Sequence, residues 1–203
     1  MSNIERIKED YEKMKVVGKE LINSYQQGYI GKDTYNVTLG DGSQVVIDTI
    51  TKNKRAGDAV VIMPITVDKK FVMVVESRPN TRCGVAIEFP AGMVDEDEEP
   101  VVAAKRELLE ETGYECEDIY LLEEHYQDQG CSEAVIRMYV ATGCRKVSKQ
   151  DLDKDENLDF VEMEYDEILN LIKNSKVDEL GINDASSKLA FWTYTMKKGD
   201  KHE

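Results

Sequence analysis

The N-terminal part of the chain carries two successive hydrophobic patterns. Over residues 2–22, apolar side chains recur every three or four positions, which predicts an amphipathic helix. Gly28 and Gly31 break that periodicity. Two β-rich runs follow, Thr34–Leu39 and Ser43–Thr51, and the Asp-Gly pair between them is a strong hairpin signal. This part of the chain is therefore expected to form a small unit of one helix and one β-hairpin.

Beyond that unit the pattern becomes that of a mixed α/β body. Two apolar runs, Ala59–Val67 and Phe71–Val75, predict a central hairpin, and a short apolar run over Val85–Phe89 follows. Pro100–Thr112 has helical composition, with proline in its first turn and Gly113 just past its end. That polarity predicts a helix with defined ends.

The rest of the body continues the alternation of strands and helices. In chain order, the segments are two β-rich runs, a charge-dense loop and two helices: Ile119–His125, Ala134–Thr142, Lys146–Asp159, Glu164–Lys173 and Asp184–Met196. No internal repeat or low-complexity linker interrupts them. The boundary is expected near residue 57, which gives an N-terminal unit of residues 1–57 and a domain of residues 58–203.

Composition and charge narrow the class of partner. The chain has 203 residues, 41% of them hydrophobic, with 26 basic and 41 acidic residues and a formal net charge of −15. This is the composition of a soluble globular protein. Its negative charge argues against nucleic acid or an anionic membrane surface as the partner. A negatively charged small substrate remains possible if a divalent cation neutralises it.

The chain also lacks signals for a membrane or a secreted location. No run approaches the ~18 consecutive apolar residues of a membrane span, and the charged N-terminus lacks the apolar run of a secretion signal. The four cysteines form no CxxC pair and only two histidines are present, which argues against structural zinc. Free thiols in a reducing cytoplasm are therefore expected.

Three glutamates in the helix predicted over Pro100–Thr112 have a spacing with chemical meaning. Glu107, Glu110 and Glu111 stand at i, i+3 and i+4, so their carboxylates share one helical face. Repulsion between these like charges destabilises the helix by a few tenths of a kcal/mol per pair, unless a cation bridges them. Oxygen ligands suit Mg²⁺ or Mn²⁺. A solvated acidic face is the alternative when the triplet is considered alone.

The complete motif decides between these two readings. The motif runs from Gly92 to Gly113. Five residues separate Gly92 from a glutamate, and seven more separate that glutamate from an Arg-Glu pair. A Glu-Glu pair follows after two residues, and the closing glycine after one more. This pattern resembles the Nudix box, with Tyr114 at a closing position where an aliphatic residue is more usual. The resemblance implies an α+β fold, a mixed sheet sandwiched between helices. It also implies hydrolysis of a nucleoside diphosphate linked to another moiety.

The resemblance assigns expected roles to the matched positions. Glu107, Glu110, Glu111 and the backbone carbonyl of Ala91 would bind the Mg²⁺ or Mn²⁺ ion. Arg106 would orient a neighbouring glutamate, because a guanidinium group can pair with a carboxylate through two parallel hydrogen bonds. The first glutamate of the box, Glu98, has no firm role. Gly92 would permit a close approach of the loop that precedes the helix.

Residues outside the box resemble one branch of the family, the ADP-ribose and nucleoside diphosphate sugar pyrophosphatases. The run Glu88–Gly92 looks like the pre-box signature of that branch, and Arg78 matches an arginine that contacts substrate phosphate. An N-terminal extension in that branch pairs across a homodimer and helps to form the nucleotide site. By this resemblance, the chain would form a homodimer in which Tyr29 and Tyr35 bind substrate by stacking on its base.

A loop after the box both matches and departs from that branch. Gln129 stands where the ADP-ribose group usually has a proline. Glu133 matches a loop glutamate that binds metal or acts as general base. With Glu110, Glu111 and Arg106, it completes the expected catalytic set.

The expected reaction is divalent-metal-dependent hydrolysis of ADP-ribose or a related nucleoside diphosphate sugar. Its products would be a nucleoside monophosphate and a sugar phosphate. The replacement at position 129 keeps GDP-mannose, UDP-glucose or a dinucleoside polyphosphate open as the substrate. A further alternative is a sensor that binds such a nucleotide without cleaving it.

Overall fold

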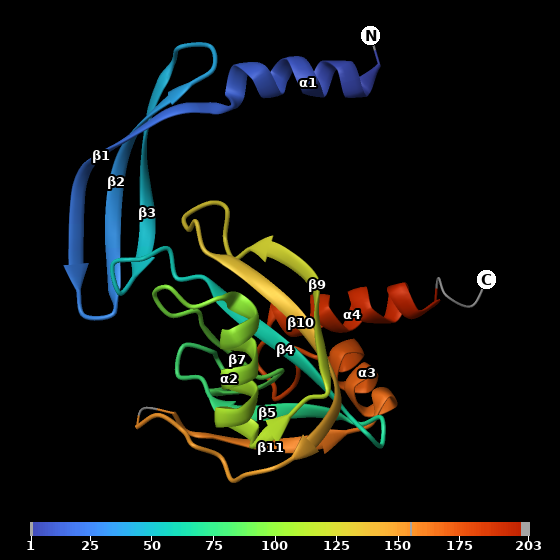
Figure 1. The fold of residues 1–203 in the computed structure, drawn as a ribbon. Helices are drawn as coiled ribbons and strands as arrows, with labels where there is room; N and C mark the ends of the chain where they lie inside the picture. The colour runs from blue at the N-terminus through green and yellow to red at the C-terminus, as the bar shows by residue number, and fades with distance from the viewer. Residues whose placement is uncertain (1, 155, 200–203) are drawn as a thin grey trace. The chain divides into compact units, whose positions relative to one another are not determined.

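The computed structural model describes residues 2–154 and 156–199 (Figure 1). It contains two compact units. One comprises the residues up to Gly57 together with Tyr126–Ala134, and the other comprises Asp58–His125 and the chain from Val135 onward. The loop Tyr126–Ala134, which the predicted domain of residues 58–203 would include, groups with the N-terminal unit instead. Among the residues described, no helix combines the length and apolar character that a bilayer crossing requires.

The N-terminal unit is built on a three-stranded antiparallel sheet in the order β1-β2-β3. Its elements in chain order are α1 (Asn3–Met14), β1 (Val16–Gln27), β2 (Ile30–Leu39) and β3 (Gln44–Lys52). The hairpin predicted around the Asp-Gly pair is confirmed as β2 and β3. Backbone hydrogen bonds tie the end of α1 to the turn of this hairpin, where the Gly40 amide donates to the Lys15 carbonyl at 2.9 Å.

The helix predicted over residues 2–22 is wrong in its second half. It stops at Met14, and Val16–Gln27 is a strand paired with β2 along its length. Two β-branched residues followed by Gly18 have low helix propensity, and pairing with β2 gives their backbone groups partners. Gly28, which was expected to break the helix, adopts a φ of 64° in the turn between β1 and β2.

The second unit contains a mixed sheet, in which β10 runs parallel to β4 and antiparallel to β8, while β11 and β4 run antiparallel to β5. The order is β11-β5-β4-β10-β8, with β6, β7 and β9 added on β5, β4 and β10. The elements are β4 (Ala59–Thr66), β5 (Phe71–Ser77), β6 (Val85–Glu88), β7 (Ala91–Met93), α2 (Pro100–Thr112), β8 (Tyr114–Glu115), β9 (Asp118–Tyr126), β10 (Val135–Lys146), β11 (Leu158–Met163), α3 (Tyr165–Asn174) and α4 (Ala185–Gly199).

Side-chain alternation along β4 creates the layers of this unit. Because successive strand residues point to opposite faces, Val60 and Ile62 pack in one buried cluster with Leu108 of α2. Met63 packs in the other cluster with Phe191 of α4 and with residues of α3. The sheet therefore lies between α2 on one face and α3 and α4 on the other (Figure 1). This confirms the predicted α/β/α sandwich and fixes α2 against the central strands.

Candidate active site

The helix that carries the three glutamates is anchored at both ends by local sequence. It spans Pro100–Thr112, as predicted, and Gly113 caps it in the left-handed conformation at φ 70°. At the other side of the motif, β7 pairs Gly92 with Val60 of β4. A Cβ on Gly92 would lie 1.9 Å from Cδ of Glu107, so only glycine lets this strand approach the carboxylate so closely.

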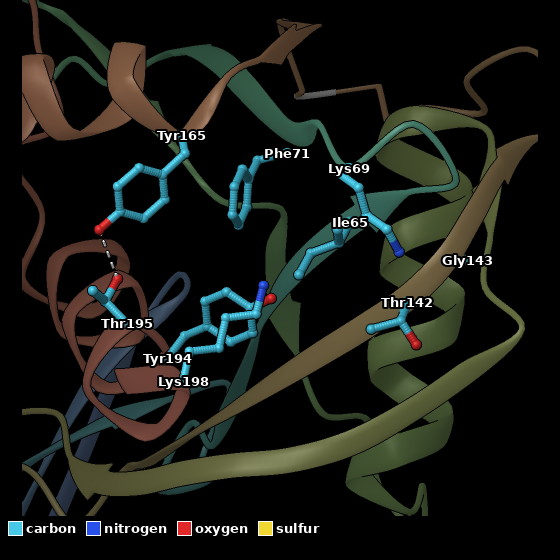
Figure 2. A pocket seen from close by; sticks show the side chains of 9 residues that line it. All are labelled: Ile65, Lys69, Phe71, Thr142, Gly143, Tyr165, Tyr194, Thr195 and Lys198. Carbon is cyan, nitrogen blue, oxygen red and sulfur yellow. Dashed lines mark hydrogen bonds between the residues drawn. The ribbon is translucent and has the colours of Figure 1, made fainter. Parts of the chain in front are cut away.

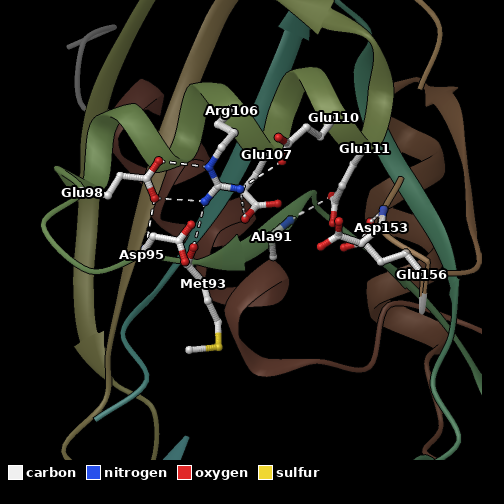
Figure 3. A network of polar contacts seen from close by, with 10 residues as sticks. All are labelled: Ala91, Met93, Asp95, Glu98, Arg106, Glu107, Glu110, Glu111, Asp153 and Glu156. Carbon is white, nitrogen blue, oxygen red and sulfur yellow. Dashed lines mark hydrogen bonds and ion pairs between the residues drawn. The ribbon is translucent and has the colours of Figure 1, made fainter. Parts of the chain in front are cut away.

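Arg106 lies at the centre of the polar network in Figure 3. Its Nε and Nη2 atoms each donate to one oxygen of Glu98 at 3.0 Å, which is a bidentate pair. Nη1 donates to Glu107 at 2.8 Å and to Glu110 at 3.0 Å, and Nη2 also donates to the Met93 carbonyl at 3.0 Å. These bonds join the loop before α2 to the helix, and they lower the pKa of Glu98 below its usual value.

Glu107 and Glu111 are the buried members of the triplet, with exposed fractions of 7% and 3%. Burial raises the pKa of Glu111 to about 9, and the nearby charge of Glu107 adds to the shift. Burial likewise raises the pKa of Glu107 to about 7, although Arg106 opposes it. The Ala91 amide donates to Glu111 Oε2 at 3.1 Å. Both carboxyl groups are thus costly to ionise without a neighbouring cation.

The donor set fits a hard divalent cation, although the side chains are not gathered around one point. Within the described residues, no three Asp, Glu, His or Cys side chains converge on a common centre. Glu107 and Glu110 instead face Arg106. Mg²⁺ commonly takes one or two carboxylates and completes its octahedron with water and substrate phosphate. Glu107 and Glu111, adjacent and buried, can supply those two.

The structure adds Glu156, which lies in the charge-dense loop predicted over Lys146–Asp159. Its charge contributes to the raised pKa values of both Glu107 and Glu111, so it lies near them. The loop is docked on the end of α2, because the Gln150 side chain donates to the Glu111 carbonyl at 2.7 Å. The Asp153 amide holds the Glu156 carboxylate at 2.9 Å. The only signal in the sequence was a run of acidic residues, and such runs are usually surface.

Arg78 also lies beside this carboxylate cluster. Its Nε donates to Glu88 at 2.7 Å and its Nη2 pairs with Glu76 at 2.8 Å. Burial raises the pKa of Glu76 to about 7 and raises that of Glu88 as well. The charge of Glu111 acts on Arg78. The structure thus brings the predicted phosphate-binding arginine to the predicted metal ligands.

Three predicted site residues lie in the N-terminal unit. Glu133 forms an ion pair with Lys19, whose ammonium lies 4.0 Å from the centre of the Tyr35 ring. Tyr29 follows Gly28 in the turn between β1 and β2 and is half exposed. These residues belong to a different unit from the carboxylates of α2, and their part in the site stays a prediction.

A separate cavity of about 580 Å³ opens at the other end of β4 (Figure 2). Whereas β7 pairs with Ala59–Val61, this cavity is lined by Ile65, near the end of the strand. Phe71, Tyr165 and two lysines also contribute to its wall, and no carboxylate of the described residues lines it. Within that part of the chain, it offers none of the carboxylate ligands that a hard cation prefers.

Comparison with known proteins agrees with the geometry. The family model described as NUDIX domain matches residues 55–182. A methanol dehydrogenase activator from Bacillus methanolicus is 36% identical over 146 residues, covering 71% of this chain and 76% of the relative. An ADP-ribose pyrophosphatase from Bacillus subtilis is 29% identical over 120 residues, covering 59% and 64%. A GDP-mannose pyrophosphatase from Escherichia coli is 28% identical over 151 residues, covering 71% and 78%.

A solved structure supports the same fold. It is described as an ADP compounds hydrolase, and it matches with a TM-score of 0.73 at 20% identity, covering 94% of this chain and 96% of that one. At that identity the likeness concerns the fold. The family model covers more than half of the chain and includes the complete Gly92–Gly113 motif. The chain therefore belongs to the Nudix family.

Proposed function

We propose that this protein hydrolyses the diphosphate of ADP-ribose or a related nucleoside diphosphate sugar in the presence of a divalent cation. The products are a nucleoside monophosphate and a sugar phosphate. One observation carries the proposal: Glu107 and Glu111 are both buried, Glu107 is held by Arg106 against Gly92, and the charge of Glu111 acts on Arg78. Carboxylate ligands for a divalent cation, close to an arginine that can bind phosphate, suit a diphosphate substrate.

The cation would be held by Glu107 and Glu111, with Glu110 and the Ala91 carbonyl as further ligands. When bound, Mg²⁺ or Mn²⁺ supplies Lewis-acid polarisation of the diphosphate and neutralises part of its charge. Raised pKa values of the two buried carboxyl groups support this assignment, because a cation offsets the cost of ionising them.

The chain's own residues then bind the substrate and move a proton. Arg78 binds diphosphate oxygens and is held in place by Glu76 and Glu88. A water attacks one phosphorus, the bond from that phosphorus to the bridging oxygen breaks, and a carboxylate accepts the proton of the water. We assign this role to Glu156, whose charge acts on both Glu107 and Glu111. Arg106 keeps Glu98, Glu107 and Glu110 in position.

The N-terminal unit contributes a second set of proposed roles. Glu133 is an alternative proton acceptor, and Tyr29 and Tyr35 stack on the nucleobase. We also assign homodimer formation to this unit. Large apolar side chains exposed on its strands, such as Leu21, Ile22 and Val46, support that assignment, since exposed apolar patches commonly mark interfaces.

Two of the relatives are named for different nucleotide sugars, so they do not agree on the substrate. The Bacillus subtilis relative is an ADP-ribose pyrophosphatase and the Escherichia coli relative is a GDP-mannose pyrophosphatase. Gln129 at the loop position favours testing GDP-mannose, UDP-glucose and a dinucleoside polyphosphate alongside ADP-ribose. A sensor without catalysis is the remaining alternative, and the intact carboxylates of α2 argue against it.

Turnover of that substrate panel with Mg²⁺ or Mn²⁺ tests the proposal. Glu111→Gln should lower turnover at least ~100-fold, because it removes a charged ligand at the reacting centre. Glu96→Gln is the matched control, since Glu96 is exposed in the loop before α2 and stands at no fixed position of the motif. Wild-type protein that binds these nucleotides but cleaves none would establish the sensor alternative instead.

A further inference from the structure

The cavity of about 580 Å³ near the end of β4 has no part in the proposed hydrolysis (Figure 2). Its volume is within the usual range for small-molecule pockets. All of its lining residues belong to the second unit, and they come from β4, β5, β10, α3, α4 and the turn between β4 and β5. The cavity is therefore a feature of the domain itself, with a lining drawn from both the sheet and the helices.

Aromatic side chains form the apolar part of the cavity wall. Phe71 and Tyr194 are buried and pack edge to face, with their ring centres 6.1 Å apart. The ring centre of Tyr165 lies 6.5 Å from that of Phe71, and its hydroxyl group is 3.3 Å from the Thr195 hydroxyl group. These rings also pack on the core, so the wall is in place before a ligand binds. Such a surface suits an apolar or aromatic body.

Two lysines add positive charge beside this wall. Lys69 lies in the turn between β4 and β5, and Lys198 lies in the last turn of α4. Figure 2 shows both among the residues that line the cavity. Both lysines are exposed, so a ligand in the cavity can reach them. The Lys198 ammonium group lies 4.9 Å from the centre of the Tyr194 ring, which places a cation next to the aromatic surface.

Neither lysine of the cavity has an anionic partner, whereas a sequence neighbour of each has a polar partner in the protein. Lys70 forms an ion pair at 3.7 Å with a carboxylate of β11, and Lys197 donates to a backbone carbonyl of β9 at 2.6 Å. Within the described part of the chain, Lys69 and Lys198 form no ion pair with any carboxylate. Their charges are therefore available to a ligand.

The charge of the cavity is opposite to that of the whole chain. The formal net charge is −15, yet none of the described carboxylates lines this space. Glu117 lies next to Gly143 of the wall, where an added Cβ would be 2.6 Å from its Oε2, and it is already paired with Arg145. Two ammonium groups beside an aromatic wall are complementary to a molecule that combines an apolar body with an anionic group.

We propose that this cavity binds a small amphiphilic anion, with its apolar body against the aromatic wall and its anionic group at Lys69 and Lys198. The site is separate from the carboxylates of α2, and it does not depend on the proposed hydrolysis. It gives this acidic chain a second place at which a small anion binds, without a metal ion.

Binding of 2-naphthoate tests the site, because this probe joins an aromatic body to one carboxylate. Calorimetric titration in EDTA at low ionic strength is compared with that of 2-naphthamide, which has the same rings and no charge. We expect the wild type to bind 2-naphthoate about tenfold or more tightly than 2-naphthamide, and added salt to weaken only the charged probe. Equal affinity for the two probes, or no binding of 2-naphthoate at millimolar concentration, would overturn the proposal.

Two substitutions test the role of the lysines without changing the wall. Lys198→Gln removes one charge and Lys69→Asn removes the other, and asparagine tolerates the φ of 68° at position 69. Each should weaken binding of 2-naphthoate about threefold, and the double variant about tenfold, while the affinity for 2-naphthamide stays the same. Lys173→Gln is the control, since it removes an exposed charge from α3 outside the cavity. A double variant that binds as tightly as this control would contradict the assignment.

A third substitution blocks the space instead of the charge. Thr142 is half-buried in β10 at the cavity wall, and strands accept aromatic residues, so Thr142→Phe should weaken binding of both probes. Glu111→Gln, in the separate active site, should leave both affinities unchanged. Unchanged binding in folded Thr142→Phe, or loss of binding in Glu111→Gln, would place the anion elsewhere and overturn the proposal. None of these titrations measures nucleotide turnover, so failure of the proposed hydrolysis would leave the test intact.

Discussion

Replacing Gly92 by alanine should damage catalysis far more than folding. The added Cβ would lie 1.9 Å from both Cδ and Oε1 of Glu107. Ordinary van der Waals contact begins at 3.4 Å, so the carboxylate must move by more than an ångström. The clash is with the end of a flexible side chain and not with backbone. The fold can therefore absorb it, at a cost of about 1–3 kcal/mol, as for other overpacked sites.

The displaced group is one of the two buried ligands proposed for the cation. A misplacement of about 1 Å at a reacting centre can cost about 100-fold in rate. We therefore expect Gly92→Ala to lower kcat about 100-fold and to weaken the dependence on Mg²⁺, while the thermal unfolding midpoint falls by only a few degrees. Steady-state kinetics across a Mg²⁺ titration and a melting curve on the same preparation measure both effects.

Gly18→Ala is the matched control for the same chemical change in a strand. A Cβ there would meet Thr38 at 3.6 Å, which is an ordinary contact. Its activity and melting temperature should stay near those of the wild type. If Gly92→Ala kept wild-type kcat and Mg²⁺ dependence, the close approach of β7 to Glu107 would have no functional meaning and the reasoning would be wrong.

Three further outcomes follow from the same structure. Glu156→Gln should lower kcat about 100-fold with little change in KM, whereas exposed Asp159→Asn should leave both unchanged; equal rates for the two variants would remove Glu156 as proton acceptor. Mg²⁺ should raise the melting temperature of the wild type but not of Glu111→Gln, and an equal shift in both would place the ion elsewhere. Burial raises the pKa of the Cys144 thiol to about 12, so only about one molecule in 10⁴ is thiolate at pH 8. A disulfide reagent should therefore modify partly exposed Cys83 in the native protein and Cys144 only after denaturation, and rapid native labelling of Cys144 would contradict its burial.

Elements with strong local signals were predictable from the sequence. The helix Pro100–Thr112 has proline at its start and glycine at its end, and both act within the element itself. The apolar run of β4 identified a buried strand because both faces of the sheet are covered. Residues 16–22 were mistaken for helix because their apolar spacing fits either structure, and pairing with β2, a non-local event, decided between them.

The same limit applies within the candidate site, where the sequence predicted Glu107 and Glu111 but not Glu156. Glu107 and Glu111 were predictable because a helix places i and i+4 on one face. Glu156 lies some forty-five residues further along, in a loop whose position depends on bonds from Gln150 and Asp151 to carbonyls of α2. No local pattern encodes those bonds.

The four glutamates of the motif differ in whether Arg106 balances their negative charge. Glu98, Glu107 and Glu110 each accept a hydrogen bond from its guanidinium group, so part of their charge is already balanced. Glu111 is the most buried of the triplet, and the Ala91 amide is the hydrogen-bond donor to its carboxylate among the described residues. Glu111 is more deeply buried than Glu107, and no guanidinium group opposes the effect as Arg106 does at Glu107, so the pKa of Glu111 is raised further. Glu111 is therefore the proposed ligand whose charge would depend most on a bound cation, and its substitution is the most direct test of the site.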